Sequence, residues 1–374
     1  MAFALAFLVA LAVTALIVRF GGRHGHLNDH DLTGPQKMHV RAVPRVGGAA
    51  IFAGIACAVA VIARGHPGTS HEMTVLLACA LPTFVAGLVE DVTKKVPPRW
   101  RLVITAVSAV LALCFLGAMI DRTDVAALDW LVVWPAEAAA LTLFVVTGVT
   151  NAINLIDGFN GLASMSTVMM LLGLAFVASR VGDDFIGVLA LLTAAATMGF
   201  FLLNYPRGHI FLGDGGAYFL GFVLVELSVL LLQRHPRVSP MFPLLLCGYP
   251  IFETVFTMYR RRFLQRTATG LPDARHLHHL VYRRLTRASD VHQRARLNSR
   301  TSPYLWALGL VAIVPAVCFW DDTNALLIGV LSFMLVYVLA YWLLARSEAS
   351  RGTVLVASSA PLPEAEHPGQ VAGT

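Results

Sequence analysis

Residues 131–150 read LVVWPAEAAALTLFVVTGVT, residues 151–161 read NAINLIDGFNG, and residues 162–179 read LASMSTVMMLLGLAFVAS. The first and third stretches are apolar runs of about twenty residues, the length of α-helix that crosses a bilayer. The middle stretch carries three asparagines and one aspartate, which hydrocarbon solvates poorly. Apolar runs and short polar segments alternate in this way along the chain, so we predict an all-α, polytopic integral membrane protein.

The composition supports a membrane protein. The chain has 374 residues, of which 57% are hydrophobic and 13% are charged, and its mean hydropathy is +0.70. Soluble domains carry about 25% charged residues, and a soluble fold would need about ten buried helices without charged faces. We therefore predict one membrane domain over residues 1–345. A disordered cytoplasmic tail, rich in Ala, Ser, Pro and Gly, is expected over residues 346–374.

Eleven spans are predicted, and the basic residues orient them. The spans cover residues 2–20, 46–63, 73–90, 102–120, 131–150, 161–179, 185–204, 215–232, 240–259, 302–320 and 324–345. The segments on one side, with the C-terminal tail, hold 22 of the 28 Lys and Arg residues, and the other side holds five. Because basic residues collect in cytoplasmic loops, we predict an external N-terminus and a cytoplasmic C-terminus.

Four polar segments fall on the predicted cytoplasmic side. They are Glu90-Asp91, NAINLIDGFNG at 151–161, FLGDGG at 211–216 and RHLHH at 275–279. Cytoplasmic active-site loops are accordingly predicted at residues 21–45, 90–101, 150–161, 205–216 and 260–301. The charge bias thus predicts that groups scattered in sequence meet in one site, able to hold a divalent metal and phosphates.

The acids and amides suit a hard metal ion beside an anionic substrate. Glu90 and Asp91 precede a segment with four cations, at positions 94, 95, 99 and 101. Asn154 and Asp157 are three residues apart, so one helical face would present both. Asp214 stands between glycines at the start of a span, where exposed backbone N–H groups suit phosphate. Oxygen ligands of this kind hold Mg²⁺ near phosphates.

Aromatic and histidine side chains complete the predicted site. Phe211 could stack on a nucleobase, or could belong to an interfacial aromatic belt. His276, His278 and His279 lie in a segment with 11 basic residues. No cysteine or well-spaced fourth ligand accompanies them, so we favour phosphate binding over a zinc site.

Taken together, these segments resemble the polyprenyl-phosphate N-acetylhexosamine-1-phosphate transferase superfamily (glycosyltransferase family 4). This superfamily includes phospho-MurNAc-pentapeptide translocase and the undecaprenyl-phosphate GlcNAc-1-phosphate transferases. The segment GPQKMHVRAVPRVGG at 34–48 is similar to its first cytoplasmic loop. The resemblance runs from about residue 30 to residue 285, and five motifs in register make it specific.

The resemblance implies a reaction in which a lipid phosphate attacks the β-phosphorus of a UDP-N-acetylhexosamine and UMP leaves. Mg²⁺, or Mn²⁺ in its place, is the implied cofactor. The implied catalytic groups are Asp91, Glu90, Asp157 and Asp214, with Asp214 as the main metal ligand and Asn154 as a second. The implied nucleotide-binding groups are Asp157, Asn160 and Phe211, and the implied phosphate- and sugar-binding groups are Lys37, Arg101, His276, His278 and His279.

Two positions depart from the family pattern. Glu90 stands where a paired aspartate is usual, and its longer side chain could still reach a metal. Asn160 stands where an aspartate is frequent; it can hydrogen-bond uracil but cannot act as a general base. The second pKa of a phosphate monoester is near 6, so the attacking phosphate needs no strong base. We therefore favour direct attack, with Asp91 orienting that phosphate or accepting a residual proton, over a covalent aspartyl-phosphate.

The histidine segment favours the GlcNAc-1-phosphate branch, because the translocase branch has three consecutive histidines. The expected role is to start O-antigen or similar surface-polysaccharide synthesis at the bacterial inner membrane, with the site on the cytoplasmic face. The expected partners are UDP-N-acetylhexosamine, undecaprenyl phosphate and membrane lipids, with no nucleic acid. The sequence leaves open the donor sugar (a 6-deoxy sugar is the alternative) and whether the chain forms a homodimer. A transporter of anionic solutes is the rival class.

Overall fold

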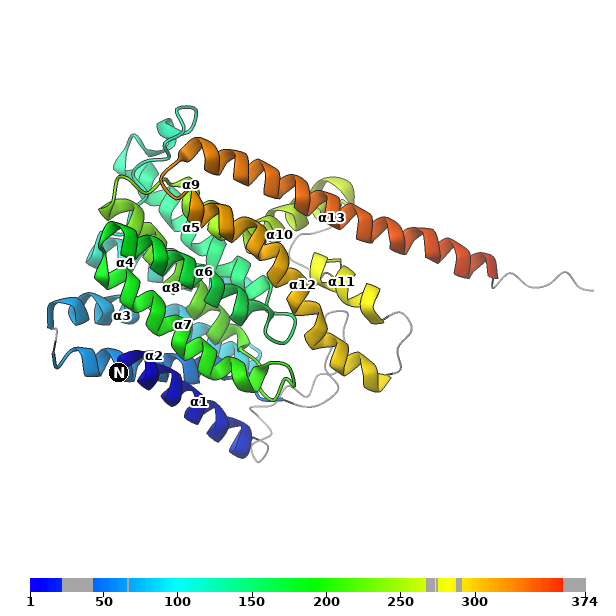
Figure 1. Ribbon diagram of the computed structural model, residues 1–374, viewed down its shortest axis with the longest axis horizontal. Helices are drawn as coiled ribbons and strands as arrows, with labels where there is room; N and C mark the ends of the chain where they lie inside the picture. Colours follow the sequence, from blue (N-terminus) through cyan, green and yellow to red (C-terminus); the bar gives the residue numbers. More distant parts are fainter. Residues whose placement is uncertain (22–42, 66, 267–272, 274, 287–290, 359–374) are drawn as a thin grey trace, which may run out of the picture.

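The computed structural model describes residues 1–21, 43–65, 67–266, 273, 275–286 and 291–358, and it confirms an all-helical bundle (Figure 1). Nine described helices are long and apolar enough to cross a membrane. They are α1 (Ala2–Gly21), α3 (Pro67–Thr93), α4 (Pro98–Leu116), α5 (Pro135–Leu155), α6 (Leu162–Val181), α7 (Asp184–Asn204), α8 (Gly213–Arg234), α12 (Val291–Cys318) and α13 (Thr323–Ser358). The chain is therefore a multi-pass membrane protein.

The two other predicted spans differ from expectation. The span predicted at 46–63 is α2 (Gly47–Ile62), an apolar helix of only 16 residues. The span predicted at 240–259 is divided into α9 (Met241–Leu246) and α10 (Gly248–Tyr259) by a non-helical backbone at Cys247. Pro250 lies in the first turn of α10, where its missing N–H is tolerated. Its ring would clash with the backbone of the preceding turn if α9 and α10 formed one continuous helix. The count of eleven full spans is thus not confirmed.

Both ends of the membrane domain are helical. Met1 lies at one end of the bundle, and α13 leaves the bundle at the opposite end (Figure 1). Helix α13 continues to Ser358, so the first part of the tail for which we predicted disorder is helical, and residues 359–374 lie outside the described part. Between α10 and α12, a short π-turn, η3 (Arg260–Leu264), precedes α11 (Leu277–Thr286). The predicted 260–301 loop therefore contains regular helix.

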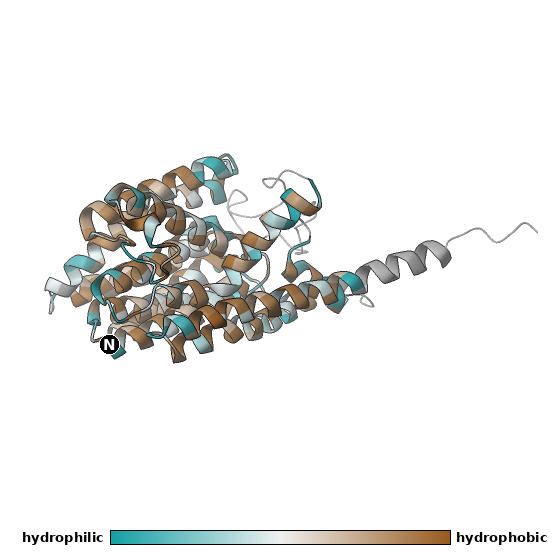
Figure 2. Cartoon of the chain, turned by 90° about the horizontal axis from the view of Figure 1, so that it is seen from above, coloured by the Kyte–Doolittle hydropathy of each residue, from teal (hydrophilic) through white to brown (hydrophobic). Residues whose placement is uncertain are grey.

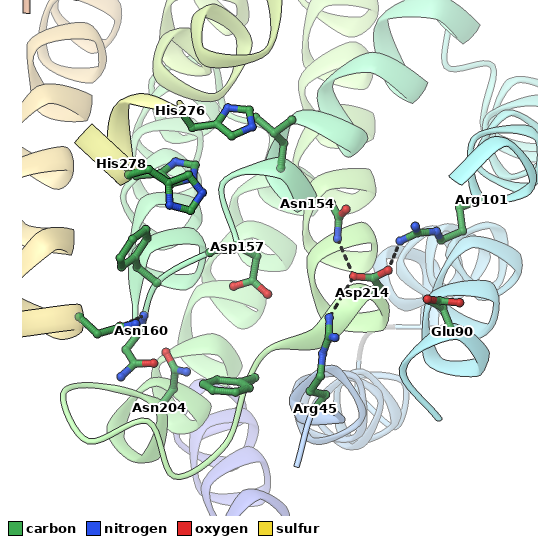
Figure 3. Close-up of a pocket in the computed structure, with 16 residues that line it drawn as sticks. Arg45, Glu90, Arg101, Asn154, Asp157, Asn160, Asn204, Asp214, His276 and His278 are labelled. Carbon is green, nitrogen blue, oxygen red and sulfur yellow. Dashed lines mark hydrogen bonds and ion pairs between the residues drawn. The ribbon is translucent and has the colours of Figure 1, made fainter. Parts of the chain in front are cut away.

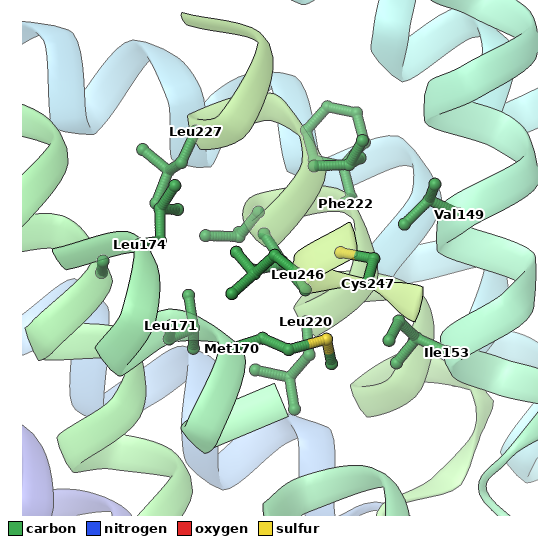
Figure 4. Packing of buried hydrophobic residues seen from close by; sticks show 14 of the residues in the cluster. Val149, Ile153, Met170, Leu171, Leu174, Leu220, Phe222, Leu227, Leu246 and Cys247 are labelled. Carbon is green, nitrogen blue, oxygen red and sulfur yellow. The ribbon is translucent and has the colours of Figure 1, made fainter. Parts of the chain in front are cut away.

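Helix α8 forms the centre of the bundle. Its apolar window is completely buried, and it packs against α2, α3, α5, α6 and α7. Leu220 and Phe222 of α8 lie among side chains of α5 and α6, as Figure 4 shows. The peripheral helices instead present exposed apolar side chains, such as Phe115 and Phe144, outward. Figure 2 shows that the helices are hydrophobic along most of their length. The exposed apolar side chains suit contact with lipid.

Glycines let neighbouring helices approach the start of α8. A Cβ on Gly48 of α2 would lie 2.3 Å from Gly216, and one on Gly87 of α3 would lie 2.6 Å from Gly215. Gly213 has φ +76°, and a Cβ there would meet the carbonyl of Arg45 and the carboxylate of Asp91. The FLGDGG segment is therefore glycine-rich because three helices converge on it with almost no space between backbones.

Candidate active site

The four polar segments meet in one cavity of about 440 Å³ at the end of the bundle where α13 leaves it (Figure 3). Its lining comprises Arg45, Glu90, Arg101, Asn154, Leu155, Asp157, Gly158, Phe159, Asn160, Asn204, Phe211, Asp214, His276, His278, His279 and Asn298. All of the predicted site residues in the described part line this cavity except Asp91. Lys37 lies outside the described residues.

Asp214 lies at the electrostatic centre of the cavity. It occupies the first turn of α8, where the helix dipole favours a carboxylate. Arg101 from the first turn of α4 donates to Asp214 Oδ2, and Arg45 Nη2 lies 3.6 Å from Oδ1. Asn154 Nδ2 also donates to Oδ1, at 3.1 Å. Three elements thus direct nitrogen donors at one carboxylate, as Figure 3 shows.

Asp91 is placed differently from our prediction. Its side chain is 1% exposed, and its two oxygens accept hydrogen bonds from the backbone nitrogens of Asp214 at 2.8 Å and Gly215 at 2.9 Å. Asp91 therefore holds the first turn of α8 and does not face the cavity. The backbone N–H groups of this segment were expected to suit phosphate, but those of Asp214 and Gly215 already donate to Asp91.

Glu90 lies beside the cavity and connects α3 to the segment before α4. Its Oε2 accepts a hydrogen bond of 2.7 Å from the backbone nitrogen of Val96. An aspartate would be shorter by one methylene and would reach Val96 poorly. Glutamate at this position thus fixes the turn that carries Arg101 toward Asp214.

The turn after α5 carries the groups predicted to bind the nucleotide. Burial raises the pKa of Asp157 to about 7, although the Arg45 guanidinium opposes this shift. Gly161 donates its N–H to Asn204 Oδ1 at 2.7 Å, and the backbone N–H of Asn160 donates to Asn298 Oδ1 at 2.9 Å. Hydrogen bonds to α7 and to α12 therefore both hold this turn in place.

The Asn160 side chain is also engaged. Its Nδ2 lies 3.3 Å from Ser299 Oγ and 3.4 Å from the carbonyl of Pro206. Its backbone carbonyl accepts a bond of 2.7 Å from Ser302 Oγ. Asn160 thus links the turn to α12 while it lines the cavity.

The histidines are packed into the cavity wall. His278 and His279 belong to the first turn of α11, and Phe159 contacts both rings, with centroids 5.5 and 5.6 Å away. Burial lowers the pKa of His278 well below its usual range and lowers that of His279 to about 3. Both rings are therefore neutral near pH 7, and the positive charge close to Asp214 comes from Arg45 and Arg101.

Glu253 is a buried residue that orients this cluster and that the sequence analysis missed. It lies on α10 and is 0% exposed. Its Oε1 accepts from the backbone nitrogen of Leu277 at 3.0 Å and lies 3.1 Å from His276 Nδ1. Thr257 Oγ1 is also 3.1 Å from that nitrogen. A carboxylate only accepts hydrogen bonds, so Glu253 fixes both the start of α11 and the orientation of His276.

Arg45, Asn204 and Asn298 also line the cavity without having been predicted to do so. Arg45 lies within the GPQKMHVRAVPRVGG segment, directly before α2, and that position was a usable signal. Backbone bonds of Phe211 with Pro44 (2.8 Å) and Gly47 (3.1 Å) hold it there. Nothing in the sequence around Asn204 or Asn298 marks either residue. Each lines the cavity because it accepts a backbone hydrogen bond from the 156–161 turn, a contact that only the fold brings about.

The donor groups are compatible with a magnesium ion. Within the described ranges, no three His, Cys, Asp or Glu side chains lie together as a ready metal site. Mg²⁺, however, commonly uses one or two carboxylates and completes its shell with water and substrate phosphates. Asp214 supplies such a carboxylate. Asn154 presents its NH₂ to Asp214 and would turn its amide to offer oxygen to a metal held there.

Comparison with known proteins identifies the family of the chain. The model of the family described as Glycosyl transferase family 4 matches residues 73–232. A probable undecaprenyl-phosphate N-acetylglucosaminyl 1-phosphate transferase of Bacillus subtilis (strain 168) is 33% identical over 286 residues, covering 74% of this chain and 75% of its own length.

Two further relatives are named undecaprenyl-phosphate alpha-N-acetylglucosaminyl 1-phosphate transferases. The protein of Salmonella typhi is 29% identical over 259 residues, which cover 66% of this chain and 67% of the relative. That of Escherichia coli (strain K12) is 26% identical over 254 residues, with the same coverage of 66% and 67%.

The bundle and its polar cavity are thus those of a membrane-embedded transferase. The chain belongs to glycosyl transferase family 4, in its polyprenyl-phosphate hexosamine-1-phosphate branch, and is a phosphoglycosyl transferase.

Proposed function

We propose that this protein transfers N-acetylglucosamine-1-phosphate from UDP-N-acetylglucosamine to undecaprenyl phosphate and releases UMP. The convergence of Arg45, Arg101 and Asn154 on Asp214 carries the proposal. These groups line a polar cavity at the end of a bundle of apolar helices. A lipid phosphate can reach such a cavity from the membrane, and a soluble nucleotide can reach it from water.

The main barrier is repulsion between two anionic phosphoryl groups. Arg45 and Arg101 carry fixed positive charge beside Asp214, and guanidinium groups bind phosphate oxygens in a bidentate manner. In the proposed reaction they turn from Asp214 toward the phosphates and hold the lipid oxygen in line with the β-phosphorus. Electrostatic stabilisation and alignment of this kind supply most of the catalysis of phosphoryl transfer.

Mg²⁺ is the proposed cofactor, with Asp214 and the turned amide of Asn154 as its protein ligands. When bound, it would neutralise charge on the diphosphate. The phosphate monoester is mostly dianionic at neutral pH, so attack needs no strong base. Both oxygens of Asp91 are bonded to backbone N–H groups, which supports direct attack without an aspartyl-phosphate intermediate.

The nucleotide is proposed to bind toward the turn at 156–161. Asp157 and Asn160 offer an acceptor and a mixed donor–acceptor group to the uracil edge. Phe211 would stack on the ring. The neutral rings of His278 and His279, beside the His276 that Glu253 orients, would donate single hydrogen bonds to the sugar or phosphates. Product formation would start synthesis of an O-antigen or a similar surface polysaccharide.

A reconstitution assay tests this function. Purified full-length protein, Mg²⁺, UDP-N-acetylglucosamine and undecaprenyl phosphate should together yield UMP and a lipid-linked sugar. A panel of UDP-N-acetylhexosamines, 6-deoxy donors included, would identify the sugar. Absence of UMP release with every donor would contradict the proposal and favour a transport function.

We also propose that the cavity faces the cytoplasm of the bacterial inner membrane. The excess of basic residues on that side supports this orientation. Lys95 and Asp121 are exposed and lie in connections that α4 separates. In intact cells, a membrane-impermeant maleimide should label Asp121→Cys but not Lys95→Cys. The reverse pattern would invert the topology.

A further inference from the structure

Tyr218 lies directly beneath Asp214 in the interior of the bundle. It is 1% exposed and does not line the cavity. Because the two residues are four positions apart in α8, their side chains lie one above the other on the same face of the helix. The Tyr218 ring therefore belongs to the layer about 6 Å further along the axis of α8 than the carboxylate at the centre of the site.

Arg101 of α4 contacts both of these side chains. Its Nη1 donates to Asp214 Oδ2, and its guanidinium carbon lies over the Tyr218 ring, 5.7 Å from the ring centroid. A guanidinium within about 6 Å of a ring centroid is attracted by the negative face of the ring, most strongly where water is excluded. The Arg101 side chain is only 13% exposed, so this cation–π contact is largely shielded from water.

Helix α5 contacts the same two positions of α8. Asn154 Nδ2 donates to Asp214 Oδ1 at 3.1 Å (Figure 3), and the Tyr218 hydroxyl donates to Asn151 Oδ1 at 3.1 Å. Asn151 and Asn154 are three residues apart, so both lie on the face of α5 that meets α8. Two layers thus join α4, α8 and α5. Arg101, Asp214 and Asn154 form the layer at the cavity, and Arg101, Tyr218 and Asn151 form the layer beneath it.

Close packing fixes the Tyr218 ring. A Cβ on Gly221 of α8 would lie 2.9 Å from the Cα of Thr150 on α5, so the two backbones touch within one turn of Tyr218. The hydroxyl bond to α5 fixes the outer edge of the ring, and a densely packed interior leaves little space for the ring to turn. The ring face is therefore a preformed surface for the guanidinium.

The guanidinium of Arg101, by contrast, has a hydrogen-bond donor to spare. Among the residues that the structure describes, its buried Nε has no hydrogen-bond partner. A buried donor of this kind costs free energy until an acceptor reaches it. A phosphate beside Asp214 would supply that acceptor once the guanidinium turns, because the planar fork of arginine suits two phosphate oxygens at once.

We propose that Tyr218 is a positioning residue that holds Arg101 beside the reacting phosphates when the guanidinium leaves Asp214. This inference rests on the proposed function, in which Arg101 exchanges its carboxylate partner for phosphate. Tyr218 itself touches no substrate and acts through Arg101. Because Tyr218 lies outside the cavity lining, its contact with the guanidinium persists while metal and substrates replace the other contacts of Asp214.

Removal of the ring tests the proposal kinetically. Tyr218→Met keeps a long apolar side chain but has no ring face. We expect kcat/KM for UDP-N-acetylglucosamine to fall by about tenfold, the effect of losing a cation–π contact that is shielded from water. Tyr218→Phe keeps the ring and loses only the hydroxyl, so its kcat/KM should stay within about threefold of that of the unmodified protein. A loss in Tyr218→Phe as large as that in Tyr218→Met would overturn the proposal, because the ring would then not be the active group.

Phe222→Met is the matched control for packing. Phe222 lies one turn beyond Tyr218 on α8, is 0% exposed and packs among apolar side chains (Figure 4). This variant should lower the unfolding temperature, as Tyr218→Met does, yet leave kcat/KM unchanged. Equal losses of kcat/KM in the two methionine variants would reveal a general effect of core packing and refute the role of Tyr218.

Ring fluorination separates the cation–π contact from packing even if Tyr218→Met does not fold. Tyr218→Phe variants whose ring carries one, two or three fluorine atoms keep nearly the same shape, while the negative charge on the ring face decreases. We expect kcat/KM to fall with each added fluorine, by about tenfold in total. The same kcat/KM across the series would show that the ring face does not hold Arg101.

Binding of inorganic pyrophosphate distinguishes this inference from the proposed function. Without divalent ions, pyrophosphate should raise the unfolding temperature of the unmodified protein. The Kd derived from this shift should rise by about tenfold in Tyr218→Met but not in Phe222→Met. No stabilisation of the unmodified protein, or the same Kd in both variants, would contradict the role of Tyr218. If pyrophosphate shows the expected pattern but no donor and acceptor together yield UMP, the proposed function fails while the positioning of Arg101 stands.

Discussion

Asp91 Oδ1 lies 2.8 Å from the backbone nitrogen of Asp214. A carboxylate near the end of α3 therefore holds the first turn of α8, and this turn carries the second carboxylate, Asp214. The second Asp91 oxygen accepts from Gly215 at 2.9 Å. The two aspartates thus have different surroundings. Asp91 is bonded to backbone and buried, whereas Asp214 faces the cavity and two guanidinium groups.

This difference predicts two distinct mutant phenotypes. Asp91→Asn would place an NH₂ group against a backbone N–H, leaving a buried donor unpaired, which costs about 1–3 kcal/mol. We expect a lower unfolding temperature together with lower turnover. Asp214→Asn should keep the unfolding temperature within a few degrees but reduce UMP release by at least about a hundredfold. Thermal unfolding in detergent and the UMP assay measure both. Identical stability losses in the two variants would contradict the separate roles.

Removal of divalent cations should stop the reaction reversibly. We expect EDTA to abolish UMP release and Mg²⁺ or Mn²⁺ to restore it, because Asp214 and Asn154 offer oxygen donors. Asn154→Leu cannot supply an oxygen, so its half-saturating Mg²⁺ concentration should rise by about tenfold or more. Asn151→Leu is the control, since Asn151 accepts from Tyr218 at 3.1 Å and lies outside the cavity lining. Full activity in EDTA would refute the metal requirement.

The contact between Gly87 and Gly215 predicts a site-specific loss of stability. Gly87→Ala places a Cβ 2.6 Å from the Gly215 backbone, and overpacking of this kind costs about 1–3 kcal/mol. Gly148→Ala on α5 has no neighbour within 4 Å, and alanine favours helix by about 0.5–1 kcal/mol. Unfolding temperatures should therefore fall for the first variant and stay level or rise for the second. An unchanged unfolding temperature in Gly87→Ala would mean that α3 and α8 can move apart at little cost in stability.

Glu253 is expected to act as a positioning residue. Glu253→Gln retains an oxygen for Leu277 and His276, so most activity should remain. Glu253→Leu leaves both donors without that acceptor, and we expect the KM of the nucleotide donor to rise by about tenfold, with a smaller change in kcat. Rescue by glutamine distinguishes hydrogen bonding from charge. An unchanged KM in Glu253→Leu would exclude the positioning role.

The raised pKa of Asp157 predicts pH-dependent nucleotide binding. With a pKa of about 7 instead of the usual 3.8, this carboxyl is mostly protonated below pH 7 and ionised above it. Only the ionised form accepts the uracil N–H as a charged hydrogen bond. Without divalent ions, uridine affinity should increase by about tenfold between pH 6 and pH 8. Asp157→Asn should show a flat profile in the same titration; a matching rise in that variant would exclude Asp157 as the titrating group.

Much of the fold was predictable because membrane insertion leaves a strong sequence signal. Nine of the eleven predicted spans correspond to helices long enough to cross a bilayer. Prediction failed where length and hydropathy do not reveal backbone geometry. The break at Cys247 lies beside Gly248 and Pro250, which weaken a continuous helix inside an otherwise apolar run. Helix α11 lies in a segment whose basic residues suggested a loop.

The site shows a similar division. Acids and amides in apolar surroundings were recognisable because they are costly unless they bind something, and ten of the predicted residues do line one cavity. Arg45 was missed although it lies in the recognised GPQKMHVRAVPRVGG segment, whereas Asn204 and Glu253 were missed because each acts through a partner distant in sequence. Asp91 and Glu90 were assigned to the site together, as an acidic pair and through the family resemblance, yet adjacent residues on a helix point in different directions.

The sequence by itself determined that this chain is a helical membrane protein with clustered polar segments, because hydrophobic length and unsolvated polar groups are local properties. Only the tertiary structure decided which carboxylate faces the substrates. That choice depends on how closely α2, α3 and α8 approach through their glycines and on which backbone N–H groups remain for Asp91 to bind. Such contacts form between residues more than a hundred positions apart, where a local pattern carries no information.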